Sequence, residues 1–114
     1  MVKVTFEEKD GKLTLKLEGH AGYGDVGHDI ICSSCSILAY TVAQIVKTAG
    51  IEGDLKSVPV LQLERGDAVI TCEPIDEEEA YGTLKSTYMF AQIGYKLLAH
   101  NYPKHVQLKA FGTV

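Results

Sequence analysis

A cysteine and a histidine lie twelve positions apart near the start of the chain, and they have the chemistry of a nucleophile and its base. Cys32 falls in the first turn of a predicted helix, where unpaired N–H groups and a partial positive charge favour thiolate over thiol. His20 lies on the glycine-rich loop that precedes this helix. If the fold brings the loop over the helix start, the imidazole can exchange a proton with the thiol. The spacing therefore predicts Cys32 as nucleophile and His20 as base.

The residues between this pair could bind a substrate. Gly22 and Gly24 allow the loop to move, or a substrate backbone to approach closely. The backbone amides of Ile31 and Cys32 at the helix start could bind a developing oxyanion. Asp29 is either the N-cap of the helix or the group that orients the histidine, and we favour the cap.

The same helix start also fits a redox protein. Cys32-Ser33-Ser34-Cys35 is a C-x-x-C motif at a helix N-terminus, which is the arrangement of thiol–disulfide oxidoreductases. Against this function, Cys35 falls on the apolar stripe of the helix with Ile31 and Leu38, and no βαβ pattern precedes the motif. We therefore expect Cys35 to be a buried core residue.

A third possibility is a zinc site, for which the region offers suitable ligands: His20, His28, Cys32 and Cys35. Structural zinc sites usually draw two pairs of ligands from turns, whereas here one pair would lie in a helix and the other on a flexible loop. We therefore expect neither a metal nor a cofactor.

The elements that must position these residues begin with a β-hairpin. Residues 2–8 and 12–18 alternate apolar and polar side chains around Asp10-Gly11, a pair that suits a tight turn. An amphipathic helix follows Asp29 and ends before Gly50. A second row on this helix carries only small side chains, and we expect another helix or a partner subunit to approach it: Cys32, Ser36, Ala39 and Ala43.

The second half of the chain repeats this order loosely. Leu55–Leu63 and Ala68–Cys72 read as strands, and Pro59 indicates an edge position or a bulge for the first. A second helix starts after Asp76, its expected cap, and a last strand spans Val106–Phe111. The order strand, strand, helix, strand, strand, helix, strand predicts one α+β domain over residues 1–114, with two helices covering a largely antiparallel sheet.

The composition is typical of one globular domain. The 114 residues are 46% hydrophobic and 23% charged, and no apolar run approaches the roughly 18 residues of a membrane span. The first residues read as a strand rather than a secretory signal, so we expect a cytoplasmic protein. Its three cysteines are then free thiols. A net charge of −4 without a Lys/Arg cluster argues against nucleic-acid binding.

The segment from Gly19 to Ser36 resembles the signature of the ribosomal-processing cysteine protease family Prp. The resemblance is carried by the His20-to-Cys32 spacing and by the stretch Gly27-His28-Asp29-Ile30-Ile31-Cys32. It implies a homodimeric cytoplasmic endopeptidase, with Cys32 as nucleophile and His20 as base. The implied substrate is the precursor of a large-subunit ribosomal protein, the twenty-seventh of its series, from which an N-terminal extension is removed. Because the family cleaves after aromatic residues, an apolar groove beside Cys32 is also implied.

Two alternatives stay open at this point. Cys35 departs from the family pattern, in which an apolar residue is commoner, so a redox function of the C-x-x-C at 32–35 is retained. The alternative from another class is a non-enzymatic ribosome-associated dimer, in which Cys32 only fills the row of small side chains.

Overall fold

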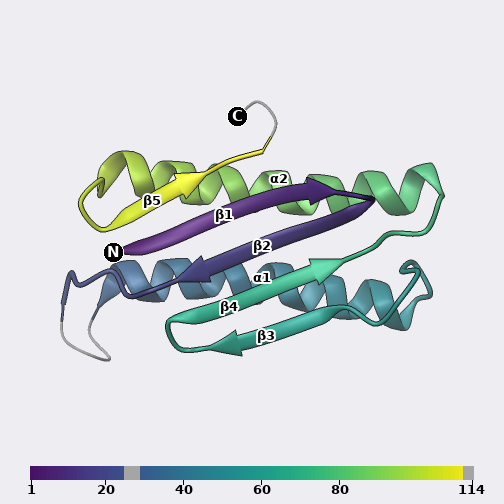
Figure 1. The fold of residues 1–114 in the computed structure, drawn as a ribbon, viewed down its shortest axis with the longest axis horizontal. Helices are drawn as coiled ribbons and strands as arrows, with labels where there is room; N and C mark the ends of the chain where they lie inside the picture. The colour runs from purple at the N-terminus through teal and green to yellow at the C-terminus, as the bar shows by residue number, and fades with distance from the viewer. Residues whose placement is uncertain (25–28, 112–114) are drawn as a thin grey trace.

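The structure is a computed structural model that describes residues 1–24 and 29–111. Over these residues the chain forms one five-stranded sheet with two helices behind it (Figure 1). The strands are β1 (Val2–Lys9), β2 (Lys12–Glu18), β3 (Val60–Glu64), β4 (Asp67–Cys72) and β5 (Val106–Lys109), and the helices are α1 (Ile30–Ile51) and α2 (Glu78–Asn101). The predicted α+β order of elements is confirmed.

The sheet is mixed, although most of its pairs are antiparallel as predicted. Its strand order is β3-β4-β2-β1-β5, in which β1 and β5 pair in parallel. The first hairpin turns at Asp10 and Gly11, whose φ angles of 54° and 78° fit the two left-handed positions of a type I′ turn. The Asp-Gly pair thus sets the register that places Lys9 opposite Lys12.

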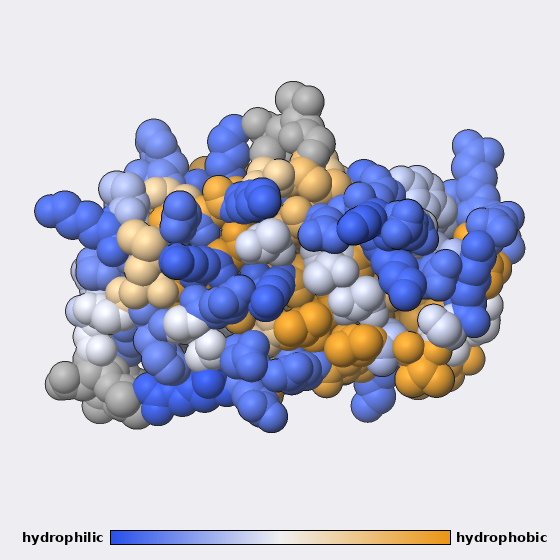
Figure 2. Space-filling view, in the orientation of Figure 1, coloured by the Kyte–Doolittle hydropathy of each residue, from blue (hydrophilic) through white to orange (hydrophobic). Residues whose placement is uncertain are grey.

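One face of the sheet is buried under the helices, because apolar and polar residues alternate along the strands. Figure 2 shows the other face, on which hydrophilic side chains predominate. Tyr88 and Tyr95 of α2 are fully buried, and their hydroxyls donate to the backbone oxygens of Ile70 (3.0 Å) and Cys35 (2.7 Å) respectively. These hydrogen bonds offset the cost of burying the two hydroxyls.

Small side chains of α1 pack in the hydrophobic core of the same chain. Ala39 and Ala43, which the sequence predicts to meet another helix or a partner subunit, belong to the hydrophobic core. The two helices also approach closely at Gly94, where a Cβ would lie 2.9 Å from the Cδ1 atom of Leu38. By length and composition α1 could also cross a membrane, but the core helix of a soluble protein has the same properties, and the buried row of α1 belongs to the core.

The start of α2 differs from the prediction. Its N-cap is Glu77, whose side chain makes no capping hydrogen bond, rather than Asp76. The carboxylate of Asp76 instead pairs with Lys56, with 3.0 Å between Oδ1 and Nζ. The loop that carries this lysine is held beside the turn by a hydrogen bond from the N–H of Ile75 to the oxygen of Asp54. Asp76, which was expected to cap the helix, therefore pairs with Lys56 instead.

Two strands are shorter than predicted. β3 begins after Pro59 rather than at Leu55, because proline has no N–H to donate to a neighbouring strand. It is an edge strand, as this proline indicates. β5 ends at Lys109, because the backbone N–H and C=O of Phe111 bond the side-chain amide of Gln92, at 2.9 and 2.8 Å.

Candidate active site

The cysteine and the histidine predicted as a pair line the same cavity, which has a volume of about 690 Å³. Three parts of the chain form its walls: the start of α1, the loop after β2 and the turn between β3 and β4. Cys32 comes from the first part, His20 from the second and Gly66 from the third. The fold therefore brings the two side chains to one site.

Cys32 is the third residue of α1 and is half-buried. Its Sγ atom accepts a hydrogen bond from the backbone N–H of Ala21, at 3.2 Å. The sulfur therefore points toward the loop that carries His20, and not only into the core. The surroundings of Cys32 thus suit a nucleophile better than a core residue.

His20 is exposed, and its ring lies against the turn between β3 and β4. A Cβ at Gly66 would lie 2.6 Å from the Nε2 atom of His20, so a side chain there would displace the ring from this position. The φ of +77° at Gly66 favours glycine for a second reason. The N–H of Gly19 donates to the oxygen of Gly66 at 2.9 Å and holds the loop on the turn. Gly66 therefore positions His20, although in the sequence it is recognisable only as a turn residue.

Asp29 is buried and caps α1. Its Oδ1 atom accepts the N–H groups of Ile31 (3.0 Å) and Cys32 (2.9 Å), and its Oδ2 atom accepts those of Tyr23 (2.9 Å) and Gly24 (3.2 Å). Burial raises the pKa of Asp29, but the four donors together outweigh burial, so the pKa lies below its usual value. Among residues 1–24 and 29–111, this carboxylate bonds backbone amides and not the imidazole.

The predicted oxyanion site needs correction. The amides of Ile31 and Cys32 donate to Asp29, so they are not free at the helix start. The amide of Gly24 donates to the same carboxylate. Gly22 lines the cavity with a φ of +68° and has nothing within 4 Å of the place that a Cβ would take. The cap that orders the helix therefore competes with any oxyanion for the same donors.

The second cysteine of the C-x-x-C motif lies in the core. Cys35 is 2% exposed, and burial raises the pKa of its thiol to about 12, with smaller contributions from Cys32 and Asp29. A thiol that ionises with such difficulty is a poor partner in disulfide exchange. The described residues contain no group of three or more side chains placed to hold a metal ion, and His28 lies outside them.

The remaining walls of the cavity suit a peptide with apolar side chains. Its apolar lining includes Leu17, Ala39, Tyr40 and Leu63. Its charged lining residues where β3 turns into β4 are Glu64, Arg65 and Asp67. The apolar groove implied beside Cys32 thus has a counterpart here.

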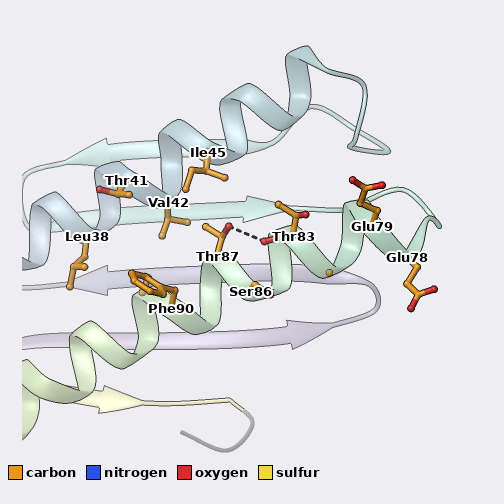
Figure 3. A pocket seen from close by; sticks show the side chains of 12 residues that line it. Leu38, Thr41, Val42, Ile45, Glu78, Glu79, Thr83, Ser86, Thr87 and Phe90 are labelled. Carbon is orange, nitrogen blue, oxygen red and sulfur yellow. Dashed lines mark hydrogen bonds between the residues drawn. The ribbon is translucent and has the colours of Figure 1, made fainter.

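A second cavity, of about 680 Å³, lies between α1 and α2 (Figure 3). Leu38, Val42 and Ile45 line it from α1, and Phe90 lines it from α2. Its ionisable lining residues, Glu78 and Glu79, lie near the start of α2, and it contains neither cysteine nor histidine. The described lining of this groove therefore offers neither a thiol nor an imidazole.

A protein-family model and several solved structures are similar to this chain. A family model described as Cysteine protease Prp matches residues 1–107. A search of curated protein sequences finds no match. Several solved structures share the fold, at low sequence identity.

One of these structures is SMU.848 from Streptococcus mutans, with 24% identity and a TM-score of 0.64, over 96% of this chain and 92% of that one. Another is an essential ribosomal processing protease Prp from S. aureus with a covalently linked product peptide, with 23% identity and a TM-score of 0.67, over 96% and 98%. The same S. aureus protein in complex with a substrate peptide has 19% identity and a TM-score of 0.63, over 96% of this chain and 98% of that one. Because the family model spans nearly the whole chain, the protein belongs to the cysteine protease Prp family.

Proposed function

We propose that this protein is an endopeptidase in which Cys32 attacks the substrate and His20 transfers the protons. The observation that supports this assignment most directly is that both side chains line one cavity. The sulfur lies at the start of α1 and accepts the N–H of Ala21. Membership of a cysteine protease family supports the reaction class, and the cavity supports the choice of residues.

The reaction follows from these positions. The thiolate of Cys32 attacks the scissile carbonyl carbon and forms a tetrahedral adduct. His20, as imidazolium, gives its proton to the leaving amine as the C–N bond breaks. A water molecule then gives a proton to His20 and attacks the thioester, which releases the carboxylate and restores the thiolate.

We further propose that the substrate is a large-subunit ribosomal protein precursor, from which the enzyme removes an N-terminal extension. The S. aureus relative is a ribosomal processing protease that has been solved with a substrate peptide and with a covalently linked product peptide. The apolar lining beside Cys32 suits an aromatic residue on the N-terminal side of the cut. A net charge of −4 suits a basic substrate.

Incubation with the purified precursor tests this proposal. We expect the mass of the precursor to fall by that of the extension, with the new N-terminus directly after an aromatic residue. Enzyme treated beforehand with iodoacetamide is the control and should leave the precursor intact, because the thiolate is consumed. An unchanged precursor mass under conditions in which the protein is folded would contradict the proposal.

We also propose that the protein acts as a homodimer in the cytoplasm. The support is the apolar lining that α1 and α2 give to the groove in Figure 3, in which Ile45 and Phe90 are exposed. Contiguous apolar surface of this kind is typical of interfaces between subunits.

A charge placed on this surface tests the dimer. Phe90 is 79% exposed, so Phe90→Glu should leave the fold intact and convert dimer to monomer in light scattering. The matched control is Val58→Glu, because Val58 is 90% exposed but lies in the segment before β3. A monomeric wild-type protein would contradict the proposed dimer.

A further inference from the structure

A histidine outside the cavity holds the loop that carries His20. The Nδ1 atom of His105 lies 2.7 Å from the backbone oxygen of Ala21. Because a carbonyl oxygen only accepts hydrogen bonds, Nδ1 carries the hydrogen, in the neutral ring as in the imidazolium. His105 directly precedes β5, so this bond joins the last strand to the active-site loop.

Ala21 uses both of its backbone groups. It is 2% exposed, its C=O accepts from His105, and its N–H donates to the sulfur of Cys32 at 3.2 Å. It also directly follows His20 in the chain. A shift of Ala21 would therefore move the donor away from the sulfur and would also move the backbone that carries the imidazole.

The ring of His105 is itself held in place. The backbone N–H of His105 donates to the backbone oxygen of Tyr102 at 2.9 Å. The backbone oxygen of His105 accepts the N–H of Val2 at 2.8 Å. Its ring meets that of Tyr23 edge-on, with 5.3 Å between centroids and 87° between planes. Tyr23 makes a similar contact with Tyr102, at 5.7 Å and 75°. These contacts fix the direction in which Nδ1 points.

We propose that His105 is a positioning residue for the protease reaction: through Ala21 it keeps an N–H donor on the sulfur of Cys32. This inference rests on the proposed function. His105 is not among the described residues that line the cavity, so it acts through Ala21 and does not itself touch the substrate. Its loss should therefore lower kcat and also slow the reaction of Cys32 in the absence of substrate.

Variants of His105 test this role in the full-length protein. His105→Ala removes the donor, whereas His105→Asn offers an amide N–H close to the position of Nδ1. We expect His105→Ala to lower both kcat and the rate of Cys32 alkylation by iodoacetamide at neutral pH by about tenfold, as for the loss of one hydrogen bond to a charged group. His105→Asn should recover most of both rates. The matched control is His100→Ala, because His100 is exposed in the last turn of α2.

Two results would overturn the positioning role: an alkylation rate of Cys32 that His105→Ala leaves unchanged, or an asparagine variant as slow as the alanine variant. If the alanine variant does not fold, His105→Leu fills a similar volume without a donor and takes its place. Alkylation needs no substrate, so it separates the two proposals. A slow Cys32 and no cleavage in the wild type contradict the proposed function, whereas a reactive Cys32 that ignores His105 contradicts only the positioning role.

Discussion

The two helices begin in different ways, although each follows a hairpin and a loop. At the start of α1, Asp29 accepts four N–H groups and Cys32 occupies the third position. At the start of α2, the side chain of Glu77 makes no capping bond and the third position is Ala80. Both starts have the positive end of a helix, so the dipole alone does not make a site. The difference lies in the loop before α1, which folds back so that its amides bind the cap and the sulfur.

The largest effect should come from Cys32, and the second cysteine of α1, Cys35, should contrast with it. Replacing the nucleophile in Cys32→Ser should lower kcat on the precursor by on the order of 10³-fold or more. Cys35→Ala should keep most of the activity and lower the free energy of unfolding by about 1 kcal/mol, because Cys35 lines the cavity but is 2% exposed and loses mainly buried volume. Cleavage kinetics and urea unfolding measure both. Equal losses of activity in the two variants would mean that the thiols act together, as in a redox protein.

The next effect concerns the base. His20→Ala should lower kcat by about 10²–10⁴-fold, because general acid–base help is lost while the thiolate remains. Iodoacetamide should still alkylate Cys32 in this variant, which would show that the nucleophile is intact. A variant with normal kcat would remove His20 from the mechanism.

A smaller effect is expected at the turn that holds His20. Gly66→Ala should displace the ring and lower kcat by up to about 10²-fold, as small misplacements of a catalytic group do. Gly53→Ala is the matched control, because Gly53 has a φ of +82° but nothing within 4 Å of its Cβ position. Both substitutions should lower the free energy of unfolding by about 1–2 kcal/mol, because alanine at a positive φ is strained. Thermal unfolding measures this loss. Similar kcat values for both would show that the ring does not depend on Gly66.

The smallest effects concern the caps themselves. Asp29→Ala should lower the free energy of unfolding by about 0.5–2 kcal/mol, whereas Glu77→Ala should leave it nearly unchanged, because only the first side chain caps a helix. Urea unfolding at neutral pH measures both. A large loss in the Glu77 variant would mean that α2 depends on its start as α1 does.

The pH dependence sharpens this contrast. The pKa of Asp29 is lowered in the folded protein, so its charged form contributes stability that is complete above the ordinary value of about 3.9. This contribution is lost as the pH falls through the lowered pKa. Urea unfolding from pH 7 to pH 2 should therefore show a smaller acid-induced loss in Asp29→Asn, whose amide oxygen still caps the helix, than in the wild type.

The sequence predicted the features that depend on neighbouring residues. Asp10-Gly11 predicted the first hairpin and its turn, and the spacing of apolar residues predicted both helices. It also predicted that Cys32 lies in the first turn of a helix. Each of these signals acts within a few residues, so no knowledge of the remaining fold was needed.

Features that depend on distant segments could not be predicted in this way. Asp29 and Asp76 look alike as helix caps, but only the second has a lysine brought beside it by another loop. The contact of His20 with Gly66 and the bond of His105 to Ala21 likewise join segments that only the sheet order brings together. Their residue types are ordinary for a turn and a strand start, so no pattern marks them.

The parallel pairing of β5 with β1 has a consequence for biosynthesis. The first strand of the chain receives this neighbour only after every other element has been made. A nascent chain that ends after α2 lacks the bond from His105 to Ala21. The contact that we propose to position the donor on the sulfur of Cys32 is therefore among the last to form during synthesis of the chain.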